Sequence, residues 1–188
     1  MQSLISAFKI LKGLPIAKYS IVKSESDLSK PDFPIWLKAD VSGHKTEEKA
    51  VLKCRNEKEA RANLDFLRKK FPSRQILMQE QTEGIEMIIG LKEDKVFGKL
   101  LMVGFGGIQA EVVKDVSFRA LPIDKKEIEK MLRELNLYPS LVTRKKYAIE
   151  KFISLAEKVS WLDVKEADFN PVILNEQEAV IVDARINI

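Results

Sequence analysis

Apolar and polar residues follow two different periods along this chain, and the change of period predicts where strands give way to helices. Residues 4–12 carry apolar side chains at helical spacing before Gly13. Two capping boxes, in which an N-cap side chain precedes a glutamate by three residues, each predict a further helix start. The expected helices are residues 4–12, one beginning at Asn56 (with Glu59) and ending near Phe71, one beginning at Asp124 (with Glu127), and 146–159.

Stretches rich in β-branched and apolar residues predict most of the remaining chain to be strand. The expected strands are 19–22, 34–39, 49–54, 75–80, 84–92, 98–103, 110–113, 116–121, 166–174 and 178–186. Because short connections join these strands and helices lie between them, the fold class is predicted as α+β with mainly antiparallel sheets. No linker composition marks a domain boundary, and 92–96 and 121–124 are candidate positions for one.

Composition then narrows the classes of function. The 188 residues are 45% hydrophobic and 32% charged, which is enough for a core and excludes a disordered chain. One cysteine excludes an internal disulfide, and one histidine excludes a multi-histidine metal centre. The apolar runs are short and no secretion signal is visible, so we expect a cytoplasmic protein without a membrane span. The net charge of +4 is interleaved with acidic residues and no aromatic platform appears, so nucleic acid is not an expected partner.

The C-terminal hairpin carries the most informative polar pair. If Glu176 and Gln177 form the centre of the turn, Asn170 opposes Asp183 across the two strands. Directly opposed side chains lie about 4.5–5.5 Å apart at Cβ. An amide oxygen and a carboxylate are hard ligands suited to Mg²⁺, which completes its shell with water and phosphate. The alternative is a hairpin held by a salt bridge between Asp168 and Arg185, without a metal.

A glycine cluster, Gly104-Phe105-Gly106-Gly107, joins two predicted strands. Glycine permits positive φ, so successive backbone N–H groups of Gly104, Gly106 and Gly107 can converge on an anion. No Lys-Ser/Thr follows the cluster, so it is not a Walker A loop. Glu111 and Arg119 follow closely, and the guanidinium fork of Arg119 suits an oxyanion. A tight structural turn is the alternative.

Three further charged residues are candidate nucleotide ligands. Lys38 lies on a strand that is otherwise apolar on both faces, so its ammonium group needs a partner or a path to the surface. An edge-strand lysine that extends to water is the alternative. Glu80 and Glu86 lie on neighbouring strands, where a carboxylate accepts hydrogen bonds from ribose hydroxyls or orients a lysine. A solvated strand face is the alternative for both.

The single histidine, His44, lies in the polar loop Val41–Thr46 beside Gly43 and Lys45. A neutral imidazole nitrogen attacks phosphorus well near pH 7, so His44 is a candidate phosphoryl acceptor. The neighbouring glycine gives the loop mobility, and Lys45 helps to neutralise a phosphate. A solvent-exposed loop histidine is the alternative.

Taken in order, these segments resemble a known family. The chain is similar to the β subunit of ADP-forming acetyl-CoA synthetase, an ATP-grasp protein related to the β subunit of succinyl-CoA synthetase. The resemblance is strongest in GIEMIIGLKEDKVFGKLLMVGFGGIQAEVVKDVSFRALPI (84–123) and EADFNPVILNEQEAVIVDARI (166–186). It is looser in ILKGLPIAKYSIVKSESDL (10–28) and in the PIWLK…HK segment (34–45).

The resemblance implies an ATP-grasp fold, with two α+β subdomains of mainly antiparallel sheets around a nucleotide cleft. The smaller subdomain would cover about residues 15–80 and the larger about 81–188, with residues 1–14 left open. It implies Lys38 on the nucleotide phosphates, Glu80 near the adenine hinge and Glu86 toward the ribose. It assigns Asn170 and Asp183 to Mg²⁺, in agreement with the hairpin register.

In that family, acyl-CoA, phosphate and ADP become acid, CoA and ATP through an acyl phosphate and phosphohistidine intermediates. The resemblance therefore implies Mg²⁺ and ATP/ADP as ligands and a CoA-binding α subunit as partner in a hetero-oligomer. His44-Lys45 resembles the family's loop pair, so His44 would receive the phosphoryl group and carry it toward the nucleotide. The glycine loop, Glu111 and Arg119 would face the meeting point of the two subunits.

The sequence departs from the family pattern at two places. The segment from Lys38 to His44 is shorter by about two residues, and Lys49-Ala50 occupies the place of a glycine pair. The family's Gly-x-Arg-Gly segment is Leu141–Lys145 here. These changes keep two alternatives open: a nucleotide-binding ATP-grasp subunit without a phosphate relay, acting as a sensor or scaffold, and another ATP-grasp carboxylate ligase that has no use for His44.

Overall fold

The structure, a computed structural model, describes residues 1–29, 31–41, 49–107, 114–143 and 146–188. The chain divides into two units. Unit 1 comprises Met1–Lys9 and Ala17–Thr82, and unit 2 comprises Ile10–Ile16 and Glu83–Ile188. The candidate boundaries at 92–96 and 121–124 are wrong, because both stretches lie inside unit 2. Within the described ranges, no helix is both long and apolar enough to cross a bilayer.

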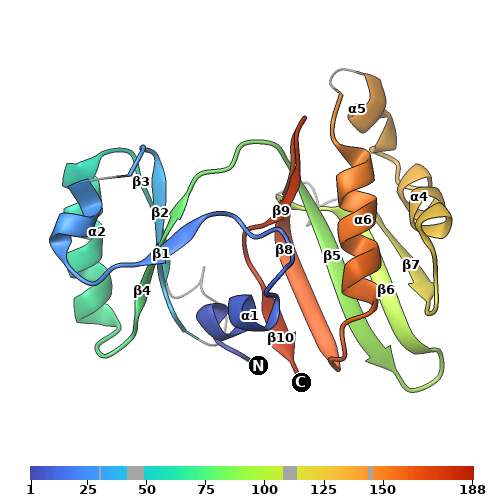
Figure 1. Ribbon diagram of the computed structural model, residues 1–188, viewed down its shortest axis with the longest axis horizontal. Helices are drawn as coiled ribbons and strands as arrows, with labels where there is room; N and C mark the ends of the chain where they lie inside the picture. Colours follow the sequence, from blue (N-terminus) through green and yellow to red (C-terminus); the bar gives the residue numbers. More distant parts are fainter. Residues whose placement is uncertain (30, 42–48, 108–113, 144–145) are drawn as a thin grey trace. The chain divides into compact units, whose positions relative to one another are not determined.

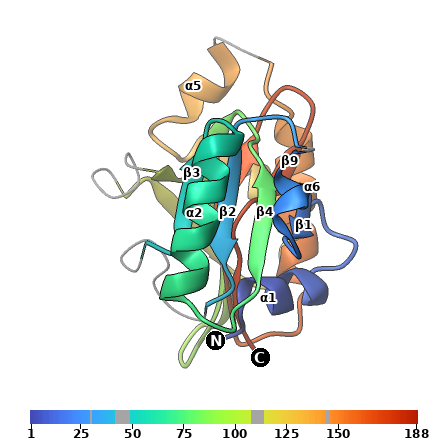
Figure 2. The ribbon, with the colours of Figure 1, turned by 90° about the vertical axis from the view of Figure 1, so that its left-hand side faces the viewer.

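Unit 1 is a four-stranded antiparallel sheet with helix α2 on one face (Figure 2). The strand order is β1-β4-β2-β3, so β2 and β4 are central. Its elements are α1 (Leu4–Ile10), β1 (Tyr19–Ile21), the 3-10 helix η1 (Glu25–Ser29), β2 (Ile35–Ala39), β3 (Val51–Cys54), α2 (Glu57–Lys70) and β4 (Ile76–Glu80).

The start of α2 and the packing of its apolar side follow from the sequence. Asn56 Oδ1 accepts the Glu59 N–H at 2.9 Å, as the capping box predicts. One apolar cluster joins the helix to the sheet and includes Ile35, Leu37 and Ala39 of β2 and Ala60, Leu64 and Leu67 of α2. Because strand side chains alternate, Trp36 and Lys38 project from the opposite face of β2.

Unit 2 is a six-stranded antiparallel sheet with α4 and α6 on one face (Figure 1). Its main strand order is β10-β8-β5-β6-β7, and β9 also pairs with β8. Its elements are β5 (Ile85–Asp94), β6 (Gly98–Phe105), β7 (Val116–Ala120), α4 (Lys125–Arg133), α5 (Tyr138–Thr143), α6 (Ile149–Ser160), β8 (Glu166–Leu174), β9 (Ala179–Ile181) and β10 (Arg185–Asn187).

The C-terminal hairpin has the register that the sequence predicts. Val172 opposes Ile181, and Asp168 opposes Arg185. The turn is fixed by Asn175, whose Oδ1 accepts the N–H groups of both Gln177 and Glu178 at 2.9 Å. The expected turn of Glu176 and Gln177 is therefore confirmed.

The expected continuous strand 178–186 is wrong, because the structure divides it into β9 and β10. The cause lies in the facing strand: β8 shifts register against β5 between Phe169 and Val172. Pro171 within this shift has no N–H to donate, while its carbonyl accepts the Val182 N–H at 3.1 Å. The bulge thus interrupts the ladder between β9 and β10 but preserves the register on both sides of the interruption.

Other differences are local. The pattern does not predict η1 or α5, which are only five and six residues long. The expected strand 110–113 lies outside the described residues. The remaining predicted helices and strands are present, with ends that shift by a few residues.

Candidate functional site

The two faces of the unit 2 sheet can be told apart by their contacts. Ser117 Oγ on β7 donates to Glu134 Oε2, just beyond α4, at 2.7 Å, so Ser117 is on the helix-covered face. The register places Val103, Ile89 and Phe169 in line with Ser117. These three apolar side chains are fully buried and belong to the core beneath the helices.

The second face of the sheet carries Glu86, one of the expected nucleotide ligands. Strand alternation places Glu86 and Gly90 of β5 on this face. Gly90 opposes Asp168 of β8, which in turn opposes Arg185 of β10. The second face of unit 2 therefore carries Glu86 and Gly90 of β5, Asp168 of β8 and Arg185 of β10.

Asn170 and Asp183 lie where the ladder is interrupted. The pairs on either side keep one register, and interpolation between them sets Asn170 opposite Asp183. Asn170 is exposed and Asp183 is half-buried. One Asp183 oxygen accepts the Ala184 N–H at 2.9 Å, which holds the carboxylate close to its own backbone. An amide oxygen and a carboxylate fit Mg²⁺, whose remaining ligands are commonly water and phosphate oxygens.

Asp168 is an acidic neighbour of this pair that the sequence assigns only to a salt bridge. Burial raises the pKa of the Asp168 carboxyl, and the charge of Arg185 opposes that rise. The charges of Asp183 and Glu166 raise it further. Within the described residues, no group of three or more His, Cys, Asp or Glu side chains is arranged to hold a metal. A cation here would thus depend on oxygens supplied by its substrate or by water.

The glycine cluster packs tightly against β5 and β7. The Gly106 N–H donates to the Glu86 carbonyl at 2.7 Å, so that N–H is already used. Gly107 has φ of 72°, and a Cβ there would lie 2.5 Å from Glu86 Oε2. A Cβ on Gly104 would lie 2.6 Å from the Asp115 carbonyl oxygen. The structure therefore explains these glycines by close packing and brings Gly106 and Gly107 against Glu86; their expected role as a phosphate cradle stays a prediction.

Lys38 is a buried lysine in the middle of a sheet. It lies on β2 between Val51 and Leu77, on the face opposite α2, and is 4% exposed. The edge-strand alternative is wrong, because β2 has a partner on each side. Burial of an ammonium group is unfavourable unless charge or hydrogen bonds compensate it. The expected role of Lys38 on the nucleotide phosphates stays a prediction.

Glu80 ends β4 in unit 1, where its N–H donates to the Lys18 carbonyl at 3.2 Å. Its carboxylate lies 3.7 Å from the Lys18 ammonium and is 52% exposed. An exposed pair of this kind contributes little to stability and leaves the carboxylate accessible. His44 and Glu111 lie outside the described residues, so their expected roles stay predictions.

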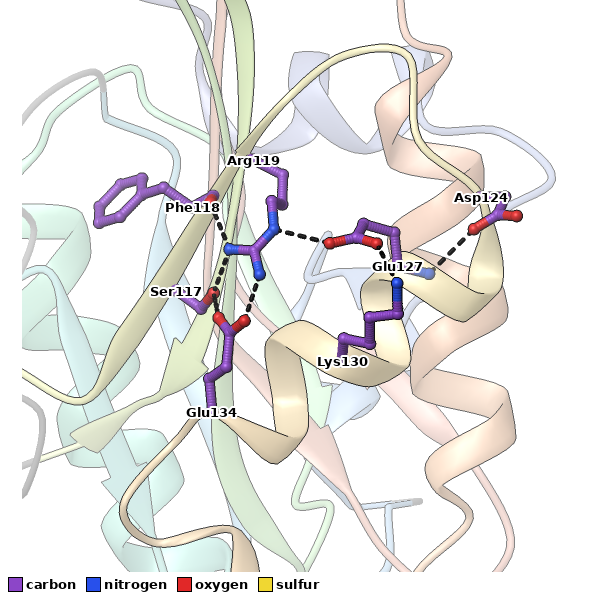
Figure 3. Close-up of polar contacts among 7 residues, drawn as sticks. All are labelled: Ser117, Phe118, Arg119, Asp124, Glu127, Lys130 and Glu134. Carbon is purple, nitrogen blue, oxygen red and sulfur yellow. Dashed lines mark hydrogen bonds and ion pairs between the residues drawn. The ribbon is translucent and has the colours of Figure 1, made fainter.

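Arg119 is held by side chains of its own unit (Figure 3). Its Nε donates to Glu127 Oε1 at 2.8 Å, and its Nη2 donates to Glu134. Its Nη1 donates to the Phe118 carbonyl and to Ser117 Oγ. Arg119 lies in line with Leu101, on the helix-covered face, whereas Glu86 is on the second face. Within unit 2, Arg119 and Glu86 therefore lie on opposite faces of the sheet, and the expected catalytic role of Arg119 stays a prediction.

Comparison with known proteins identifies the family. A family model described as an ATP-grasp domain matches residues 6–188. The chain belongs to the ATP-grasp family. This ATP-grasp chain is 32% identical over 206 residues to the beta subunit of acetate–CoA ligase [ADP-forming] I of Pyrococcus furiosus, covering 96% of this chain and 88% of that one. It is 33% identical over 190 residues to acetate–CoA ligase [ADP-forming] II of Archaeoglobus fulgidus.

The second match covers 93% of the ATP-grasp chain but only 28% of the Archaeoglobus protein, so the chain spans less than a third of that relative. Among solved structures, it resembles an acetyl-coenzyme A synthetase of Candidatus Korarchaeum cryptofilum with a TM-score of 0.81 and 28% identity, covering 100% of this chain and 93% of that one. That structure contains coenzyme A and Mg-AMPPCP, and its phosphohistidine segment points towards the nucleotide-binding site. The resemblance and the fold class inferred from the sequence are confirmed.

Replacing Gly107 by Ala should destabilise the ATP-grasp chain more than replacing Gly98 by Ala. Both glycines have φ of 72°, but a Cβ meets nothing within 4 Å at Gly98 and meets the Glu86 carboxylate at Gly107. We expect Gly98→Ala to cost about 1 kcal/mol of unfolding free energy and Gly107→Ala only slightly more, because the exposed, flexible Glu86 side chain can move away from the added Cβ. Urea unfolding measures both costs. Adding Glu86→Ala should remove most of the excess at Gly107; an unchanged excess would show that the clash is elsewhere.

Replacing Arg119 by Met should lower stability at neutral pH, and the loss should shrink in acid. Hydrogen bonds from Arg119 hold the pKa of Glu127 and of Glu134 below the ordinary glutamate value. Their contribution is complete above about pH 4.3 and is lost as the pH falls through the lowered pKa values. Urea midpoints from pH 7 downward measure the effect.

The matched control for Arg119→Met is Arg133→Met, because Arg133 is exposed and its only carboxylate partner among the described residues is Glu129. The Arg133 variant should lower the urea midpoint less at every pH. Equal midpoints for the Arg119 variant and the wild type at pH 7 would contradict the structural role of this network.

Proposed function

We propose that this chain is the nucleotide-binding β component of an ADP-forming acyl-CoA synthetase. Together with a CoA-binding α component, it would bind Mg-ADP and convert acyl-CoA, phosphate and ADP into acid, CoA and ATP. Two curated relatives that match more than nine-tenths of the chain are named as ADP-forming acetate–CoA ligases, and one of them is a beta subunit. Both names give acetate as the acid. The proposal assigns this chain to the same class of enzyme, the ADP-forming acyl-CoA ligases.

The single observation that carries the proposal is the register that sets Asn170 opposite Asp183. This register is kept on both sides of an interrupted ladder. It would supply two hard oxygen ligands from one ribbon, which is the sparse set expected for a metal that is also held by nucleotide phosphates. Mg²⁺ would neutralise charge on the phosphate oxygens during transfer.

The proposal gives each of the other expected nucleotide ligands a role in binding Mg-ADP. Lys38, buried on β2, would pair with phosphate oxygens as a fixed positive charge. The exposed Glu86 carboxylate, set against Gly107, would accept hydrogen bonds from ribose hydroxyls. Glu80 would lie at the adenine. Gly106 and Gly107 would act by orienting Glu86, since the Gly106 N–H is already bound to the Glu86 carbonyl.

The proposed phosphoryl relay uses His44. A neutral imidazole nitrogen of His44 would attack the phosphorus of a phosphohistidine presented by the α component, releasing that component's imidazole. An oxygen of the ADP β-phosphate would then attack the phosphorus on His44, which forms ATP and restores the imidazole. Lys45 and Glu111 would neutralise and orient the transferring group. Arg119 has no part in the proposed relay, because two carboxylates already hold its guanidinium.

A second candidate function is a nucleotide-binding subunit without a relay. It is favoured by the segments that depart from the family pattern: Lys49-Ala50 stands in place of a glycine pair, and Leu141–Lys145 stands in place of Gly-x-Arg-Gly. A loop with less glycine is stiffer, which would limit the reach of His44. This candidate shares nucleotide binding with the first and differs only in turnover.

Replacing Asp183 by Asn should weaken Mg-ADP binding at least tenfold, while binding of ADP in the presence of EDTA should change little. The substitution keeps the size of the side chain and removes the charge that favours the cation. Titration calorimetry with and without Mg²⁺ measures both constants. Asp163→Asn, an exposed change between α6 and β8, is the matched control. Equal Mg-ADP affinity in Asp183→Asn and the wild type would contradict the metal assignment.

The relay is tested with a CoA-binding α component, acyl-CoA, ADP and phosphate. The wild-type chain should form ATP, and His44→Ala should abolish ATP formation while Mg-ADP still binds. A phosphorylated form of the chain that is labile in acid and absent from His44→Ala would identify the imidazole as the acceptor. Nucleotide binding without turnover in the wild type would favour the second candidate over the relay.

A further inference from the structure

Asp115 is a buried carboxylate that the proposed function does not use. It is 4% exposed and directly precedes β7. Three N–H groups donate to its carboxylate: the Asn136 backbone at 2.8 Å, the Asn136 side-chain amide at 3.2 Å and the Leu137 backbone at 2.9 Å. Burial of a carboxylate is unfavourable unless such hydrogen bonds compensate it. These bonds hold the start of β7 against the turn between α4 and α5.

The backbone of Asp115 contacts the glycine cluster. Its carbonyl accepts the Phe105 N–H at 3.1 Å. A Cβ on Gly104 would lie 2.6 Å from the same carbonyl oxygen, so this close approach requires glycine. The preceding residue, Lys114, has φ of 49°, a left-handed conformation that is unfavourable for a residue other than glycine. A strained position therefore comes directly before the residue that joins the α4–α5 turn to the glycine cluster.

The glycine cluster connects Asp115 to Glu86. Gly106, the neighbour of Phe105, donates its N–H to the Glu86 carbonyl at 2.7 Å. A Cβ on Gly107 would lie 2.5 Å from Glu86 Oε2, so the cluster also packs against the carboxylate. The contacts from the α4–α5 turn through Asp115 and the cluster to Glu86 are continuous, and all of them lie within unit 2.

We propose that Asp115 is a positioning residue for the Glu86 carboxylate. The inference rests on the proposed binding of Mg-ADP, in which Glu86 accepts hydrogen bonds from ribose hydroxyls. Asp115 would contact no ligand, because it is buried beside the α4–α5 turn. It would act by holding the end of the β6–β7 ladder, and with it the glycine cluster, at a fixed distance from β5. A chain of contacts demonstrates energetic coupling only when the coupling is measured, and a double-mutant cycle measures it.

The cycle combines Asp115→Asn with Glu86→Gln, and titration calorimetry on the full chain gives the affinity for Mg-ADP. Asp115→Asn keeps the size of the side chain but replaces one acceptor oxygen by an amino group, which cannot accept an N–H. We expect Asp115→Asn to weaken Mg-ADP binding about fivefold when Glu86 is present. In the Glu86→Gln background, which should itself bind Mg-ADP more weakly than the wild type, Asp115→Asn should cause no further loss.

The matched control is Ser117→Ala. Ser117 Oγ donates to Glu134 Oε2 at 2.7 Å, so this bond also joins β7 to the end of α4 (Figure 3). Ser117 opposes Val103, which precedes the glycine cluster on β6. Ser117→Ala should therefore lower the urea midpoint and leave the affinity for Mg-ADP unchanged. Equal losses of affinity in Ser117→Ala and Asp115→Asn would show a merely structural role and would overturn the proposal.

Asn136→Ala decides the question if Asp115→Asn does not fold. Asn136 is exposed, and the change removes only its side-chain hydrogen bond to Asp115. We expect Asn136→Ala to weaken Mg-ADP binding about twofold, and only when Glu86 is present. An unchanged affinity would then overturn the proposal.

The outcomes separate this inference from the proposed function. If the wild type binds Mg-ADP and Asp115→Asn has no effect, or has the same effect in both backgrounds, the positioning role is wrong and the proposed function stands. If Glu86→Gln binds Mg-ADP as tightly as the wild type, the ribose role of Glu86 is wrong, and the positioning role fails with it. If the wild type does not bind Mg-ADP at all, the proposed function itself is wrong.

Discussion

The pairing of β8 with the two short strands that follow it is the constraint on which the candidate site depends. A shift of one residue would move every side chain of that ribbon to the other face of the sheet. The Asx turn at Asn175 fixes the register at one end, and the Asp168–Arg185 pair shows that it survives the bulge. The paired positions stop at Asp168 and Arg185 and resume at Val172 and Ile181, so Asn170 and Asp183 lie in the middle of the interruption. The register on either side still sets these two positions opposite each other, while the backbone between the paired segments departs from the regular pleat.

Most of the fold could be predicted because its signals are local. Capping boxes marked two helix starts, and stretches of apolar and β-branched residues marked the strands, including β2 and β4 at the centre of the unit 1 sheet. The register of the C-terminal hairpin followed from a two-residue turn, because the residues on either side of the turn then pair in order. Short elements such as η1 and α5 were missed because five or six residues give too few periods for a pattern. The break after Ile181 was missed because its cause, Pro171, lies on the facing strand.

The residues of the candidate site were less predictable, since their roles depend on which face of a sheet they occupy. The guanidinium of Arg119 could bind an oxyanion. However, Arg119 lies at a strand position that faces α4, and its guanidinium forms ion pairs with Glu127 and Glu134. The glycine cluster has the composition of an anion loop, yet each glycine accommodates a neighbouring strand. For Lys38 the sequence was more informative. Its position among apolar residues indicated that its ammonium group needs a partner or a path to the surface, and the structure shows it buried on a central strand.

The two units differ in how far their polar and charged side chains are exposed to solvent. In unit 2 the charged residues of the second face are exposed or half-buried, so a ligand can reach them with little loss of hydration. In unit 1 two polar side chains are buried: Lys38 is 4% exposed and Gln79 is 0% exposed. An unpaired buried amide, such as that of Gln79, which has no hydrogen-bond partner among the described residues, costs about 1–3 kcal/mol. The buried polar groups of unit 1 therefore carry a desolvation cost that the exposed and half-buried charges of unit 2 largely avoid.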